Sequence, residues 1–237
     1  MFVFPIRDDN PTRARPLISY LVLALCMSVF FWQISLGEAQ REAILAFGMV
    51  PVRLFAPEAA YGLPNAIPAW MTLISSMFLH GGFMHLAGNM LYLWIFSDNV
   101  EDSIGRRNFV IFYLLCGIAA ALSQAFVNVR SDIPMIGASG AVAGVLGAYM
   151  IRFPKARVHV LTVIIIFITT FVVPAQIVLG LWFLMQLSGG LGSLGVDTTG
   201  GVAWFAHIGG FIIGVTSLKY FQNLKFYLLK LRLNFLI

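Results

Sequence analysis

The stretch FVIFYLLCGIAAALSQAFVNV, residues 109–129, runs for 21 positions without a charged side chain. A transmembrane helix needs about 20 mostly apolar residues, because each residue rises ~1.5 Å and the hydrocarbon of a bilayer is ~30 Å thick. Five more charge-free runs of at least 19 residues lie around it, at 16–37, 59–97, 133–151, 158–196 and 198–218. The chain is therefore expected to cross a membrane several times.

The composition excludes two other classes of protein. Of the 237 residues, 59% are hydrophobic and 11% are charged, whereas a soluble domain is about 45–50% apolar and ~25% charged. A disordered chain needs low hydrophobicity and many charges, which is the opposite balance. The net charge of +5 follows from basic residues on one side of the membrane, so binding to nucleic acid is not needed to explain this charge. The lipid bilayer is the expected partner.

The distribution of Lys and Arg predicts the number and direction of the spans, because these residues concentrate on the cytoplasmic side. With six spans and both termini inside, the inner segments hold 12 basic residues and the outer ones 3. A seventh span at 158–172 would change this to 8 against 7. We therefore predict an all-α, multi-pass protein of the cell membrane with both termini cytoplasmic. The six helices are expected near 17–36, 82–97, 109–129, 138–151, 175–191 and 202–218.

Residues 1–237 are expected to form one membrane domain. The outer loop 37–81 is long enough to be functional, and the basic tail 219–237 is expected on the cytoplasmic membrane surface. The N-terminal residues lack the features of a cleaved signal or transit peptide, so the first span is expected to stay as an anchor. The segment 158–172 is open to three interpretations: interfacial, re-entrant, or the first part of a helix kinked at Pro174.

Four polar side chains lie within the predicted spans at one depth, near the outer face: His85, Asn89, Ser139 and His207. Such groups are costly in a bilayer unless they are paired or face a wet cavity, so they mark a candidate site. A Ser and a His at one level suggest a nucleophile and its general base, since a serine hydroxyl is a weak nucleophile until a neighbouring base takes its proton.

The surroundings of Ser139 suggest an oxyanion hole. Gly137 and Gly140 leave room for a tight turn and for a substrate carbonyl. A helix beginning there would point free N–H groups at the site, and His85 and Asn89 would add side-chain donors.

Two GxxxG spacings predict how the fourth and sixth spans meet. Gly140 and Gly144 form one pair, and Gly210 and Gly214 form the other. Small residues at this spacing let helix backbones approach closely in a membrane. Contact between these faces would bring Ser139 and His207 together.

Simpler interpretations compete with the catalytic one. A Ser in a Gly/Ala-rich span is usually a packing residue, and a single membrane His often makes only a structural hydrogen bond. His80 and His159 have no partner in the sequence and are interpreted as structural. A metal site built from His80, His85 and His207 is not favoured, because no nearby carboxylate or HExxH spacing accompanies them. No metal or cofactor is expected.

Three blocks of the sequence resemble the rhomboid family of intramembrane serine proteases. They are FLHGGFMHLAGNMLYLW (78–94), GASGAVAGVLG (137–147) and AHIGGFIIG (206–214), in the family's order, and FSDNVEDSIGRRNFVIFYLL (96–115) is also similar. The resemblance covers about Trp70 to Tyr220. It implies a bundle of six transmembrane helices with a Ser139–His207 dyad and an oxyanion hole of His85, Asn89 and the backbone N–H of Ser139.

The sequence departs from the family pattern at two positions. A Trp-Arg pair in the first outer loop of many members is Trp70-Met71 here. The aromatic residue that often follows the nucleophile by four positions and stacks on the catalytic His is Ala143 here. What positions His207 is therefore left open by the sequence.

The expected function is that of an intramembrane serine endopeptidase that acts through an acyl-enzyme. The resemblance to the rhomboid family implies that its substrates are single-span membrane proteins cut near the outer membrane face. A dyad is predicted, with Asp197 in the last outer loop as the nearest candidate for a third member. The alternative is a non-proteolytic rhomboid-like chaperone that binds client helices. A transporter or channel is less favoured, because it would need polar residues at the bilayer midplane.

Overall fold

The computed structural model is mostly helical and describes residues 2–164, 167–194 and 201–234. Its six long helices are α1 (Leu17–Ser35), α5 (Phe83–Ile104), α6 (Arg106–Val127), α7 (Ser139–Arg152), α8 (Ala175–Ser193) and α9 (Trp204–Asn234). Between α1 and α5 lie the short helices α2 (Gln40–Phe47), α3 (Pro51–Phe55) and α4 (Thr72–Ser75). Single 3₁₀ turns occupy Gly37–Ala39, Pro57–Ala60, Ala69–Met71 and Ser76–Phe78.

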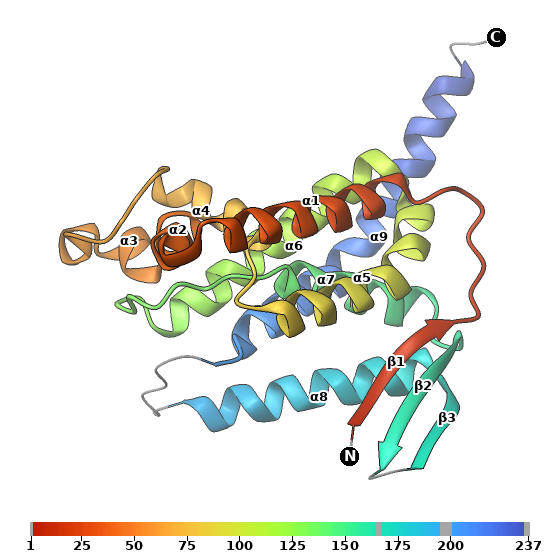
Figure 1. Ribbon diagram of the computed structural model, residues 1–237. Coiled ribbons are helices and arrows are strands. Elements are labelled where there is room, and N and C mark those ends of the chain that lie inside the picture. Colours follow the sequence, from red (N-terminus) through yellow and green to blue (C-terminus); the bar gives the residue numbers. More distant parts are fainter. Residues whose placement is uncertain (1, 165–166, 195–200, 235–237) are drawn as a thin grey trace.

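Each of the six segments expected to span a membrane contains one long helix (Figure 1). Three of these helices, α1, α6 and α8, are long and apolar enough to cross a membrane. Two helices extend by more than one turn beyond the expected boundaries. Helix α5 continues past residue 97 to Ile104, and α9 continues past residue 218 to Asn234.

The prediction of an all-α fold needs one correction, because the structure contains a three-stranded antiparallel sheet. Strand β1 (Phe2–Asp8) pairs with β2 (Arg157–Ile164), which pairs with β3 (Phe167–Pro174). The interpretation of 158–172 as the first part of a helix kinked at Pro174 is wrong, because the described residues of this segment lie in β2 and β3. Eleven of these fifteen residues are Val, Ile or Thr, and such β-branched side chains favour strands over helices. Pro174 ends β3 and immediately precedes α8.

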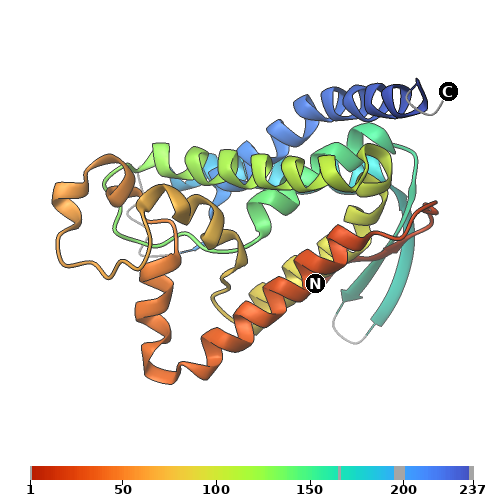
Figure 2. The ribbon, with the colours of Figure 1, turned by 90° about the horizontal axis from the view of Figure 1, so that it is seen from above.

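The sheet and the short helices lie at opposite ends of the bundle. In both views the segment with α2, α3 and α4 is at one end, and β1, β2 and β3 are at the other (Figure 1, Figure 2). At the sheet end, His159 Nε2 lies 2.9 Å from a carboxylate oxygen of Asp9. His159 is therefore part of a polar contact that joins the N-terminal segment to β2.

Helix α7 occupies the core of the bundle. Every residue from Gly140 to Tyr149 is buried. Helices α5, α6, α8 and α9 all contact it. A helix made largely of Gly and Ala suits this central place, because small side chains let several neighbouring helices approach its backbone.

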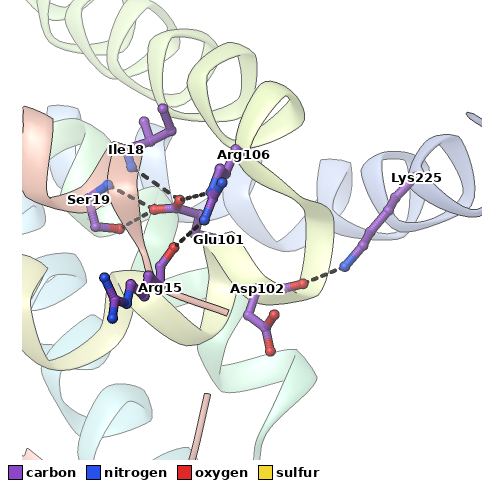
Figure 3. Close-up of polar contacts among 7 residues, drawn as sticks. All are labelled: Arg15, Ile18, Ser19, Glu101, Asp102, Arg106 and Lys225. Carbon is purple, nitrogen blue, oxygen red and sulfur yellow. Dashed lines mark hydrogen bonds and ion pairs between the residues drawn. The ribbon is translucent and has the colours of Figure 1, made fainter. Parts of the chain in front are cut away.

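The side chain of Glu101, on α5, caps the N-terminus of α1 (Figure 3). The first N–H groups of a helix have no intrahelical acceptor, and Pro16, which precedes α1, has no side-chain oxygen to supply one. The buried Glu101 carboxylate accepts hydrogen bonds from the backbone N–H of Ile18 at 3.1 Å, and from the N–H and hydroxyl of Ser19, each at 2.8 Å. Arg106 lies 4.0 Å from the same carboxylate. This cluster ties α1 to the junction of α5 and α6.

Lys225 of α9 joins the same junction from the other side. Its ammonium group donates to the backbone carbonyl oxygen of Asp102, in the last turn of α5 (Figure 3). It also donates to the carbonyl oxygen of Ser103. A cation at this position complements the negative end of the helix dipole. The extension of α9 beyond the expected span therefore contacts the end of α5.

Candidate functional site

Ser139 is the first residue of α7, and the turn before it requires a glycine. Gly137 has φ +121°, a conformation that other residues rarely adopt. A Cβ at this position would lie 2.7 Å from Nε2 of His85. The N–H of Gly137 donates to the carbonyl oxygen of Ser76 at 2.9 Å, which fixes the turn. Ser139 thus begins a helix whose first N–H groups have no intrahelical acceptor.

The structure brings Ser139 and His207 together. The Ser139 hydroxyl oxygen lies 2.8 Å from Nε2 of His207, which is in the first turn of α9. His207 is 9% exposed. The pair has the distance at which an imidazole nitrogen can accept the serine proton.

Backbone contact between α7 and α9 sets this distance. A Cβ at Gly210 would overlap the carbonyl oxygen of Gly140, and a Cβ at Gly214 would overlap that of Gly144. Gly140 follows the serine directly, and Gly210 lies one turn after His207. The two glycine pairs therefore face each other beside the dyad, and larger side chains at Gly210 or Gly214 would force the helices apart.

Two residues of α8 hold the far side of His207. Its Nδ1 lies 2.8 Å from the side-chain oxygen of Gln186. The ring of Trp182 lies against the imidazole, with ring centroids 5.7 Å apart and an interplanar angle of 38°. Trp182 thus provides, from another helix, the aromatic contact that Ala143 cannot provide.

His85 and Asn89 lie one turn apart on α5, beside Gly137. The N–H of Gly81 donates to Nδ1 of His85 at 3.2 Å, so in the neutral ring the proton is on Nε2, the nitrogen nearest to Gly137. Asn89 is 7% exposed, and its amide nitrogen has no hydrogen-bond partner among the described residues. Two N–H donors therefore lie close to the turn that carries Ser139.

Sequence reasoning missed Gln186 and Trp182. Both lie in the charge-free run 158–196 and are four residues apart, so they share a helix face. A glutamine within an apolar span was the available signal, since polar groups there are costly. Asp197, the candidate third member, lies outside the described residues.

The remaining histidines have structural surroundings. The backbone of His80 is held in both directions by the Gln33 amide of α1, at 3.1 and 3.0 Å. His159 belongs to the sheet, away from the dyad. Within the described ranges, no three His, Cys, Asp or Glu side chains gather in a way that could hold a metal ion.

Comparison with known proteins identifies a family model and several relatives that match this chain. A sequence model of the rhomboid domain matches residues 68–222. Rhomboid protease GluP of Bacillus subtilis (strain 168) is 34% identical over 137 residues, which are 57% of this chain and 24% of that protein. Rhomboid protein 1, mitochondrial, of Saccharomyces cerevisiae is 33% identical over 150 residues, 61% of this chain and 40% of that protein. Presenilin-associated rhomboid-like protein, mitochondrial, of Mus musculus is 30% identical over 155 residues, which are 64% of this chain and 38% of that protein.

These matches span less than half the length of each relative. Within this chain, however, the rhomboid domain extends from just before α4 into the middle of α9 and includes Ser139, His207 and the residues around them. Because that domain covers more than half of the chain, the protein belongs to the rhomboid family.

Proposed function

We propose that this protein is an intramembrane serine endopeptidase that cleaves transmembrane helices of other membrane proteins. The observation that carries the proposal is the 2.8 Å contact between the Ser139 hydroxyl and Nε2 of His207. Similarity to a protein named rhomboid protease supports it. The peptidase activity of this protein and its substrates are both proposed.

In the first half of the reaction, Ser139 Oγ attacks the carbonyl carbon of the scissile peptide while His207 Nε2 takes the hydroxyl proton. His207 then gives that proton to the leaving nitrogen as the C–N bond breaks, and an acyl ester remains on Ser139. In the second half, water attacks this ester with His207 again as the base. The new carboxyl terminus leaves and the serine hydroxyl is restored.

The oxyanion formed in each half is held by Nε2–H of His85, the amide nitrogen of Asn89 and the backbone N–H of Ser139. The contact of His85 with Gly81 supports this assignment, and so does the amide nitrogen of Asn89, which has no hydrogen-bond partner within the described part of the chain. Each such donor typically contributes ~2.7–4 kcal/mol to transition-state stabilisation.

We further propose that all six long helices cross the cell membrane, with both termini cytoplasmic. The excess of Lys and Arg in the inner segments supports this orientation. Ser139 and His207 then lie near the outer face, because α7 and α9 both begin there. The substrate is a single-span protein whose helix unwinds locally near that face, since a helical carbonyl is blocked by its own hydrogen bond.

The first test is cleavage of a panel of labelled single-span helices in proteoliposomes by the wild type, Ser139→Ala and His207→Ala, each checked for folding. Cleavage by the wild type alone is expected, and the fragments map the cut site. Equal cleavage by all three proteins would refute the assignment of the dyad. Binding of intact helices without cleavage would favour the chaperone function instead.

A second test concerns the absence of a catalytic carboxylate. Asp197→Asn is expected to retain turnover, because the charge-free runs provide no buried carboxylate near the dyad. Loss of turnover in a folded Asp197→Asn protein would show that the site is a triad.

A further inference from the structure

The imidazole of His207 is held between two hydrogen-bonding side chains from different helices. Nε2 lies 2.8 Å from Ser139 Oγ on α7, and Nδ1 lies 2.8 Å from Gln186 Oε1 on α8. A neutral imidazole carries one N–H, so only one nitrogen can be a donor. Which nitrogen carries the proton decides whether His207 can act as a base toward Ser139.

The partner of the Gln186 amide nitrogen decides this question. That nitrogen donates to the backbone carbonyl oxygen of Trp182, one turn earlier on α8, at 3.1 Å. A carbonyl oxygen only accepts, so the group facing it must be NH₂, and the amide oxygen must face His207. An oxygen facing Nδ1 requires the proton on Nδ1. The lone pair is then on Nε2, toward the Ser139 hydroxyl.

We propose that Gln186 is a positioning residue that holds His207 in the tautomer able to accept the serine proton. This inference rests on the proposed protease function. Gln186 is 6% exposed and contacts the base, so it acts through His207. The Trp182 ring lies against the same imidazole and restricts its rotation.

A neutral amide performs one of the two tasks of the carboxylate in a Ser-His-Asp triad. It orients the imidazole and selects the tautomer, but it adds no full negative charge to stabilise the imidazolium. The main contribution of Gln186 and Trp182 is therefore to position His207.

Two variants at this position separate positioning from simple packing. Gln186→Leu keeps most of the volume and removes the acceptor. Gln186→Glu keeps an acceptor and adds charge. The matched control is Gln176→Leu, which makes the same change at an exposed position of the same helix.

The first measurement is the ¹⁵N NMR spectrum of full-length protein with ¹⁵N-labelled histidine rings, with the His207 signals assigned by their loss in His207→Ala. The wild type and Gln176→Leu are expected to show a protonated Nδ1 and an unprotonated Nε2. In Gln186→Leu the two nitrogens are expected to share the proton. This spectrum does not depend on cleavage, so it tests Gln186 even if the proposed protease function fails.

The second measurement is the pH dependence of helix cleavage in proteoliposomes. Gln186→Leu should lower kcat by ~10²-fold, with KM unchanged, because a wrong tautomer disables the base. Gln186→Glu should restore part of kcat and move the acid limb of the profile to higher pH, since a carboxylate favours the protonated ring. A folded Gln186→Leu protein with the kcat and the histidine spectrum of Gln176→Leu would overturn the proposal, and so would a Gln186→Glu profile superimposed on that of the wild type.

Discussion

The backbone contact between α7 and α9 predicts a large effect of a very small substitution, Gly210→Ala. The new Cβ would overlap the carbonyl oxygen of Gly140 and lie 3.0 Å from its carbonyl carbon. Both partners are backbone atoms, so no side chain can rotate away. The two helices must therefore separate.

The size of the effect follows from the geometry of the dyad. A Cβ essentially never approaches another atom closer than 3.0 Å, so relief of the overlap requires a shift on the order of 1 Å in a closely packed interior. His207 lies one turn before Gly210 and moves with it, which lengthens the 2.8 Å contact to Ser139 beyond hydrogen-bond reach. A misplacement of ~1 Å costs about 10²-fold in rate, and overpacking costs ~1–3 kcal/mol in stability.

The assay is cleavage of a labelled single-span helix in proteoliposomes, together with thermal unfolding in detergent. Gly180→Ala is the matched control, because a Cβ at Gly180 of α8 meets nothing within 4 Å. This control should keep the wild-type rate and gain ~0.5–1 kcal/mol of stability from better helix propensity. Wild-type turnover by Gly210→Ala, or an equal loss of turnover in both variants, would refute the argument that glycine contact sets the dyad distance.

Three further predictions concern stability. Glu101→Gln should destabilise the protein by ~1–3 kcal/mol, because buried N–H groups of α1 lose their charged acceptor. The same change at the exposed Glu38 should leave stability unchanged. Equal melting temperatures for Glu101→Gln and Glu38→Gln would contradict this prediction. Gln33→Leu should cost ~1–3 kcal/mol, because it removes both bonds to the His80 backbone; an unchanged unfolding curve would show that these bonds are not needed. Burial raises the pKa of Asp98 from 3.8 to about 7, so the folded state holds a proton that the unfolded chain releases, and stability should fall as pH rises between these values. Asp98→Asn should flatten this dependence in melting experiments between pH 5 and 8, and an equally steep dependence in the variant would assign it to another group.

The helical parts of the fold could be predicted because their cause lies in local sequence. A long charge-free run can adopt few structures in a bilayer, and a helix is the simplest of them. The placement of Lys and Arg then indicates the direction in which each run crosses the membrane. Ser139 and His207 were also accessible to sequence reasoning, since each is a polar group beside a glycine pair in an apolar segment. Residues 158–172 were harder to predict, because an apolar run of that length fits a helix or a hairpin, and its pairing partner β1 is about 150 residues away in sequence.

The sequence by itself determined a multi-helix membrane-type chain of the rhomboid pattern and the residues expected to react. Only the tertiary structure decided how the His207 ring is oriented, because Gln186 and Trp182 become partners of His207 through the packing of α8 on α9. Nothing in the local sequence states which way a glutamine in an apolar helix will face. The three-stranded sheet was likewise decided by long-range pairing, since a strand satisfies its backbone groups with a distant segment, whereas a helix satisfies them within itself.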